Sequence, residues 1–259
     1  MRSIDVHYEL AGPRDAPVLV LAGPLGSTLD LWDRQVAALA ERFRLLRYDH
    51  RGHGRSPVPR GPYTMADLGG DALALLDRLN IERAAFCGLS LGGMVGIWLG
   101  AHAPDRLSSL VLCCTTAHFA DPGPWRERAA SVRWAGTASV APTVVARWFT
   151  PGWAAQHPEV VDRMTQMIAD TSDEGYAACC SAVAAWDGRS LLEKISVPTL
   201  VLAGAQDPGT PLTPHAEALA TGIAGAKLVV LDAAHLAVVE QAQRVNELLA
   251  RHVTSPTEQ

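Results

Sequence analysis

The segment Gly88-Leu-Ser90-Leu-Gly92 constrains the fold of this chain more than any other segment. It follows an apolar run over 84–87 and precedes apolar residues at helical spacing, namely Leu91, Met94, Val95, Trp98 and Leu99. A strand, a tight turn and a helix are the context that the G-x-S-x-G pattern requires, because the serine then sits on a strained turn with its hydroxyl exposed. Ser90 is therefore the predicted nucleophile.

The same turn predicts half of an oxyanion hole. The amide of Leu91 would lie at a helix N-terminus, where free N–H groups and the helix dipole stabilise developing negative charge. A second donor is expected from the loop Gly23-Pro24-Leu25-Gly26 that follows the apolar run 18–22. Proline has no N–H group, so Leu25 is the candidate in this loop.

Apolar runs that alternate with helical patterns predict the fold class. Continuous apolar runs at 18–22, 43–48, 84–87, 107–113, 198–204 and 227–231 are typical of strands covered on both faces. Alternation of such strands with helices indicates an α/β fold with a mainly parallel sheet and right-handed crossovers. Ile4 to Leu10 alternates apolar and polar residues and predicts an edge strand.

The segment from 117 to 194 departs from this alternation. It shows no clear strand and holds five of the seven tryptophans: Trp125, Trp134, Trp148, Trp153 and Trp186. We expect a helical cap inserted between two parts of the core, residues 1–116 and 195–259. Caps above the carboxyl ends of parallel strands are where small apolar pockets form.

Asp207 and His235 complete a predicted triad with Ser90. Both follow predicted strands, at the sheet edge where Ser90 also emerges, and the chain order serine, acid, histidine is that of hydrolases with this kind of nucleophile turn. Asp232 and Asp187 are the competing acids, but Asp232 is still at a strand end and Asp187 lies in the cap.

Two other histidines, His50 and His53, lie in the turn Asp49 to Ser56 that follows the predicted strand at 43–48. We expect this turn to be structural.

Composition excludes several other classes of function. The formal net charge is −5 and no basic block is present, so nucleic acid binding has no electrostatic support. No apolar segment reaches the roughly 18 residues of a membrane span, and the N-terminus lacks a signal-peptide pattern, so we expect a cytoplasmic protein with no membrane partner. The five cysteines lack metal spacing and are expected to be reduced, and no metal or organic cofactor is predicted.

At these residues the chain resembles the α/β-hydrolase superfamily and, over nearly its whole length, the 3-oxoadipate enol-lactonases of aromatic-compound catabolism. The resemblance is carried by Gly88-Leu-Ser-Leu-Gly-Gly-Met94, Trp98 to Arg106, Arg147-Trp-Phe-Thr-Pro151, Gly175 to Cys180 and Leu231 to Leu236. It implies an α/β-hydrolase fold and hydrolysis of a carboxylate-bearing enol-lactone to 3-oxoadipate by Ser90, Asp207 and His235. A carboxylesterase or lactonase for another small ester, and a non-catalytic ligand-binding member of the fold, are the alternatives.

The implied substrate carboxylate requires a cationic partner, since an unpaired buried charge is costly. Arg133 in the cap is the predicted partner, because the adjacent Trp134 would supply an apolar wall. Arg147 and Arg128 are the competing cations. The sequence makes no prediction of oligomeric state.

Overall fold

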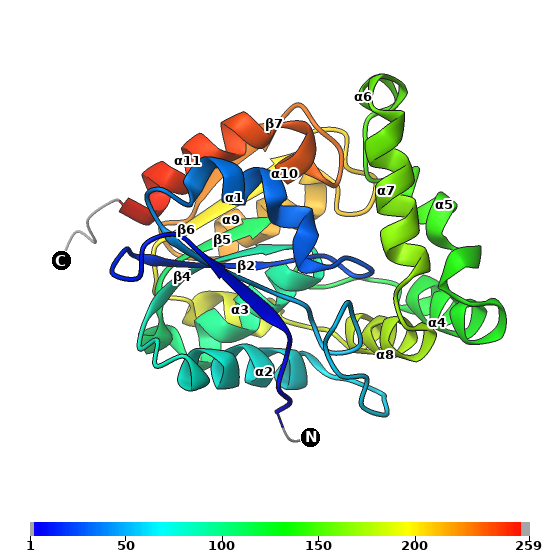
Figure 1. Cartoon of the computed structure of the whole chain (residues 1–259), viewed down its shortest axis with the longest axis horizontal. Helices are drawn as coiled ribbons and strands as arrows, with labels where there is room; N and C mark the ends of the chain where they lie inside the picture. Colours follow the sequence, from blue (N-terminus) through cyan, green and yellow to red (C-terminus); the bar gives the residue numbers. More distant parts are fainter. Residues whose placement is uncertain (1–2, 255–259) are drawn as a thin grey trace.

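A single twisted sheet organises the chain in the computed structural model, which describes residues 3–254 (Figure 1). The ends of the predicted core segments, 1–2 and 255–259, lie outside the described residues. The strand order is β1-β3-β2-β4-β5-β6-β7, with β1 antiparallel to β3 and every other pair parallel. The strands are β1 Tyr8–Ala11, β2 Val18–Ala22, β3 Arg44–Tyr48, β4 Ala84–Leu89, β5 Leu107–Cys113, β6 Thr199–Gly204 and β7 Lys227–Leu231.

Helices cover both faces of this sheet, as the continuous apolar strands predicted. Every residue of β4 and of β6 is buried. In Figure 1, α1 and α11 lie on one side of the sheet, and α2 and α3 lie on the other. The helices of the core are α1 Asp33–Leu39, α2 Met65–Arg78, α3 Leu91–His102, α9 Glu217–Gly222, α10 Ala237–Glu240 and α11 Ala242–Thr254.

The chain between β5 and β6 forms a separate group of helices, at the right of Figure 1. These are α4 Gly123–Ala135, α5 Ala141–Val145, α6 Pro151–Gln156, α7 Pro158–Ala169 and α8 Asp173–Ala184. All residues from 114 to 198 are described, and none of them joins the sheet; one isolated bridge pairs His118 with Asp187. We call this group of helices the cap. Short helical turns complete the chain: η1 Leu29–Trp32, η2 Pro104–Arg106, η3 Thr137–Ser139, η4 Arg189–Lys194 and η5 Leu212–Ala216.

The helix α2 begins at a capping box, because Thr64 and Asp67 form both of its hydrogen bonds. The predicted edge strand over Ile4 to Leu10 is shorter than expected. Its first residues bond to side chains instead of to a strand: the amide of Ile4 donates to Asp71 Oδ1 at 2.9 Å, and that of His7 to Ser56 Oγ at 2.8 Å.

Candidate active site

Ser90 occupies the turn between β4 and α3 in a strained conformation. Its backbone angles are φ 56° and ψ −111°, a region that costs a non-glycine residue about 1 to 3 kcal/mol. The flanking glycines make the turn possible: a Cβ on Gly88 would lie 2.1 Å from the carbonyl oxygen of Gly92, and one on Gly92 would lie 2.2 Å from that of Ala22. The turn therefore tolerates no side chain at either glycine.

Asp207 and His235 lie in the loops that follow β6 and β7. The Nδ1 atom of His235 is 2.8 Å from Oδ2 of Asp207. The carboxylate also accepts hydrogen bonds from the amide of Gly209 at 2.7 Å and from the Thr210 hydroxyl at 2.7 Å. Burial raises the pKa of Asp207, but His235, Thr210 and Gly209 together outweigh this effect and hold the pKa at about 2. Asp207 is thus an ionised acceptor that orients the imidazole.

The loop after β2 is tied to the Ser90 turn. The carbonyl of Gly23 accepts a hydrogen bond from the amide of Gly92 at 3.1 Å, while the amide of Ser90 donates to Cys113 O at 2.9 Å. Leu91 stands between these two engaged amides as the first residue of α3, where an N–H group has no partner within its helix. Leu25 belongs to the loop anchored at Gly23, so both predicted oxyanion donors lie on backbone segments that are bonded to each other.

Two buried histidines, His50 and His53, contact the backbone of the same loop after β2. His50 Nε2 lies 3.0 Å from Gly23 O, and the amide of Gly26 donates to His53 Nε2 at 2.9 Å. Burial lowers the pKa of His50 to about 3 and that of His53 to about 4. His53 Nδ1 lies 3.1 Å from Arg51 O, so the neutral ring accepts on one side and donates on the other. The sequence-based expectation of a structural turn here agrees with these contacts.

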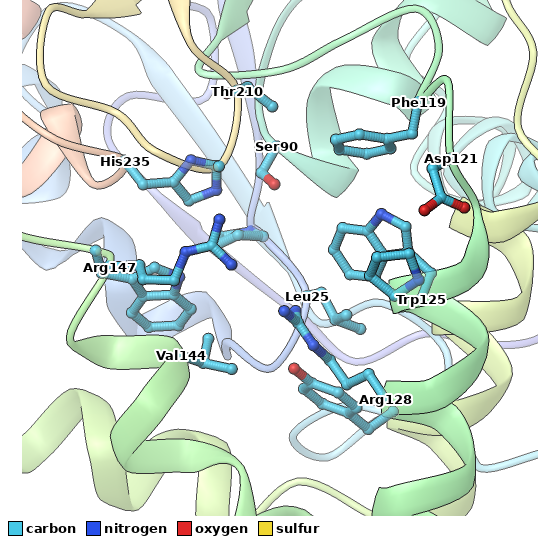
Figure 2. A pocket seen from close by; sticks show the side chains of 15 residues that line it. Leu25, Ser90, Phe119, Asp121, Trp125, Arg128, Val144, Arg147, Thr210 and His235 are labelled. Carbon is cyan, nitrogen blue, oxygen red and sulfur yellow. The ribbon is translucent and has the colours of Figure 1, made fainter.

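A cavity of about 290 Å³ opens between the cap and the carboxyl edge of the sheet. Figure 2 shows the Ser90 hydroxyl and the His235 ring projecting into the same part of it. Its lining combines two members of the predicted triad with aromatic and apolar cap residues: Pro24, Leu25, Ser90, Phe119, Asp121, Pro124, Trp125, Arg128, Val144, Arg147, Trp148, Tyr176, Gly209, Thr210 and His235.

Two guanidinium groups reach this cavity, Arg128 from α4 and Arg147 from the turn that follows α5. Arg128 lies over the ring of Trp125, with 4.6 Å between its Cζ atom and the ring centroid. Arg147 donates from Nη2 to the carbonyl of Pro208 at 2.9 Å, so part of its donor capacity is already used. The one carboxylate in the cap part of the lining is Asp121, which accepts from the amide of Gly123 at 2.8 Å.

Tyr176 adds a polar group to this apolar wall. Its side chain is fully buried, the Arg128 guanidinium lies beside its hydroxyl, and no acceptor among the described residues takes the hydroxyl proton. Burial raises the pKa of this hydroxyl, and the nearby Arg128 guanidinium opposes the rise. Tyr176 therefore offers an unused donor at the same end of the cavity as Arg128.

The expectation that Arg133 and Trp134 line the pocket requires correction. Arg133 pairs with Glu174 at 3.0 Å on the surface, and Trp134 is 92% exposed. Neither residue lines the cavity. The reason is helical rotation: α4 turns by about 100° per residue, so Trp125 and Arg128, three residues apart, share a face, whereas Arg133 is turned well away from Arg128.

The competing acids are engaged elsewhere. Asp232 accepts a hydrogen bond from Gln206 Nε2 at 2.9 Å, and Asp187 pairs with Arg189 at 2.6 Å.

Sequence reasoning did not identify Thr210 as a partner of the acid or Tyr176 as a pocket residue. The three-residue spacing from Asp207 to Thr210 was a detectable signal, because a hydroxyl at that offset reaches back to a loop carboxylate. Tyr176 lies in the segment Gly175 to Cys180 that carries the family resemblance, but no local pattern marked it as a pocket residue.

Comparison with known proteins decides the family. The sequence pattern described as alpha/beta hydrolase fold matches residues 16–242. The chain belongs to this α/β-hydrolase family. The predicted fold class is thereby confirmed, and the mainly parallel sheet agrees with it.

Relatives of this α/β-hydrolase include enzymes with stated substrates. It is 41% identical to 3-oxoadipate enol-lactonase 2 of Acinetobacter baylyi over 245 residues, which cover 95% of this chain and 91% of that protein. A crystal structure of the enol-lactonase from Burkholderia xenovorans LB400 superposes with a TM-score of 0.94 at 41% identity and covers 96% of each chain. A thermophilic esterase from Thermogutta terrifontis, solved with malate bound, superposes with a TM-score of 0.89 at 32% identity, covering 96% of this chain and 92% of that one.

Two further findings concern the α/β-hydrolase as described over residues 3–254. No helix there combines the length and the apolar character that crossing a membrane requires. Over the same residues, no three His, Cys, Asp or Glu side chains are grouped so that they could hold a metal ion.

Proposed function

We propose that this α/β-hydrolase is a serine hydrolase that opens a small enol-lactone bearing a carboxylate, with 3-oxoadipate enol-lactone as the substrate and 3-oxoadipate as the product. One observation carries the choice of an anionic substrate: the Arg128 guanidinium lies in the aromatic wall of the cavity that also contains the Ser90 hydroxyl. The relative named 3-oxoadipate enol-lactonase 2 supports the same substrate, and the enol-lactonase of known structure supports an enol-lactone. A cytoplasmic role in aromatic-compound catabolism is part of the proposal.

In the first half of the reaction, His235 removes the Ser90 proton as the hydroxyl oxygen bonds to the lactone carbonyl carbon. Asp207 holds the imidazole through Nδ1 and stabilises its charged form. The oxyanion of the tetrahedral intermediate accepts hydrogen bonds from the amides of Leu25 and Leu91. When the ring C–O bond breaks, His235 protonates the enol oxygen, and the released enol becomes a ketone.

In the second half, a water molecule attacks the ester between Ser90 and the acyl group. His235 removes a proton from the water and then returns it to the Ser90 oxygen as the acid is released. Acid, base, nucleophile and oxyanion donors all come from the chain's own residues in this scheme.

The substrate carboxylate is assigned to Arg128, with Tyr176 as a second donor. A carboxylate in an apolar cavity needs a positive partner, and hydrogen bonds to ionised groups are stronger than neutral ones. Arg128 has no salt bridge to any described residue, whereas Arg133 is neutralised by Glu174 and Arg147 is bonded to Pro208. The cavity volume of about 290 Å³ lies at the lower end of the range for small-molecule sites and suits a lactone of this size.

A general esterase for neutral esters is the alternative, and the similarity to the Thermogutta terrifontis esterase favours it. Steady-state kinetics with 3-oxoadipate enol-lactone and p-nitrophenyl acetate separate the two functions. We expect a kcat/KM for the enol-lactone that exceeds that for the simple ester by orders of magnitude. A preference for p-nitrophenyl acetate would assign the protein to the general esterases.

A further inference from the structure

Both backbone amides that flank His235 are held by groups outside the His235 loop. The amide of Ala234 donates to Glu240 Oε2 at 2.6 Å. The amide of Leu236 donates to the carbonyl of Trp148, a cap residue, at 2.8 Å. Ala234 and Leu236 are buried, so no solvent molecule replaces these acceptors when they are lost. The backbone at His235 is therefore clamped on both sides.

Glu240 extends this clamp to the cap through its second oxygen. Oε1 accepts from the amide of Thr150 at 3.0 Å and from the Thr150 hydroxyl at 2.7 Å. Glu240 belongs to α10 in the core, while Thr150 precedes α6 in the cap. One carboxylate thus joins the loop of the base to the cap.

The same cap segment also contacts the loop of the acid. Arg147, three residues before Thr150, donates to the carbonyl of Pro208, the residue that follows Asp207. Residues 147–150 therefore bond to the chain on both sides of the Asp207–His235 pair. A shift of this segment would move the two loops that set the direction of the imidazole.

We propose that Glu240 is a positioning residue for His235, and that it couples the placement of the cap to the orientation of the base. This inference rests on the proposed serine hydrolase function. Glu240 does not line the cavity, so its effect on the reaction passes through the backbone of Ala234. It should change the chemical step more than substrate binding, because a small displacement of a catalytic group costs up to about 100-fold in rate.

The bridge requires that both carboxylate oxygens of Glu240 accept hydrogen bonds, so a substitution that turns one of them into a donor tests it directly. Glu240 accepts three hydrogen bonds on two oxygens and donates none. Glutamine has nearly the same shape, but one of its terminal atoms is an NH₂ donor. In Glu240→Gln, that NH₂ must face either the Ala234 amide or the Thr150 amide, so one backbone N–H group of the bridge loses its acceptor.

The test measures the rate at which a fluorophosphonate labels Ser90, together with kcat and KM for the enol-lactone. Glu240→Gln should slow labelling and lower kcat by about 10- to 100-fold, with KM changed by less than about threefold. Thr150→Val should give a smaller loss, and Thr150→Ser should restore the wild-type rate. Glu247→Gln is the matched control, since Glu247 pairs with Arg244 on an exposed face of α11.

Coupling is tested with the double variant Glu240→Gln, Thr150→Val. Its loss should be smaller than the product of the two single losses, because both variants break the same bridge. Wild-type labelling and kcat in a folded Glu240→Gln with a lowered unfolding midpoint would overturn the proposal and make Glu240 purely structural. If Glu240→Gln does not fold, a wild-type rate in Thr150→Val overturns the coupling. Failure of the wild-type protein itself to label would instead count against the proposed function.

Discussion

The Nδ1 atom of His235 lies 2.8 Å from Oδ2 of Asp207, and this carboxylate oxygen also accepts from the Thr210 hydroxyl. The acceptor therefore selects the imidazole tautomer that has its proton on Nδ1 and leaves Nε2 free to act as the base. Both side chains reach this arrangement from loops at the same edge of the sheet, although 28 positions separate them in sequence.

Replacing Asp207 with Asn should lower kcat by roughly 10⁴-fold while leaving the fold intact, because the amide can favour the wrong tautomer of His235. Steady-state kinetics with a circular dichroism check measure this. Asp232→Asn is the control, since Asp232 bonds to Gln206 at the surface and should leave kcat unchanged. Equal losses in the two variants would contradict the assignment of the acid.

Replacing Ser90 with Ala should remove at least about three orders of magnitude in turnover, as loss of a triad nucleophile does. The unfolding midpoint of the variant should be unchanged or raised, because backbone hydrogen bonds of Ser90 and Gly92, and not the Ser90 hydroxyl, hold the turn. Fluorophosphonate labelling followed by mass spectrometry identifies the modified residue. Turnover retained in a preparation free of wild-type enzyme would refute the nucleophile.

Replacing Arg128 with Leu should raise KM for the carboxylated lactone by about 10- to 100-fold, since a charge-assisted contact of about 1.5 to 3 kcal/mol is lost. Hydrolysis of a neutral ester should change little. Arg133→Leu is the matched control, because it removes a cap arginine that is paired with Glu174 outside the cavity. Equal losses with both substrates would make Arg128 structural.

The buried histidines predict a pH dependence of stability. His50 and His53 have pKa values of about 3 and about 4, below the ordinary value of 6.5, so the unfolded chain binds protons that the folded chain excludes. The contribution of these two histidines to the free energy of unfolding is thus fully present above pH 6.5 and is lost as the pH falls toward 4. Each histidine should cost about 2 kcal/mol of the free energy of unfolding between pH 7 and pH 5.

Urea denaturation at these two pH values checks this expectation. His53→Gln keeps an acceptor for the Gly26 amide and removes one titrating group, so it should lower the difference between pH 7 and pH 5 by about half. A pH dependence equal to that of the wild type would show that His53 does not contribute to it.

The sequence by itself determined the features that depend on neighbouring residues. The Gly88 to Gly92 pattern predicts the strained turn because glycine alone fits where two backbones approach to within a Cβ radius, and the apolar runs predict strands covered on both faces. The convergence of Ser90, Asp207 and His235 could also be predicted from local patterns. Each of these residues follows a predicted strand, and the carboxyl ends of parallel strands lie at one edge of the sheet.

Only the tertiary structure decided which cap residues face the cavity. Adjacency in sequence suggested Arg133 beside Trp134, but neighbours on a helix point about 100° apart, and the packing of α4 on α8 turned Arg128 inward and left Trp134 in solvent. The bridge from Glu240 to Thr150 was equally hidden, because 90 positions separate the two residues and no local pattern links them. Contacts of this kind depend on how the cap sits on the sheet, which local patterns do not encode.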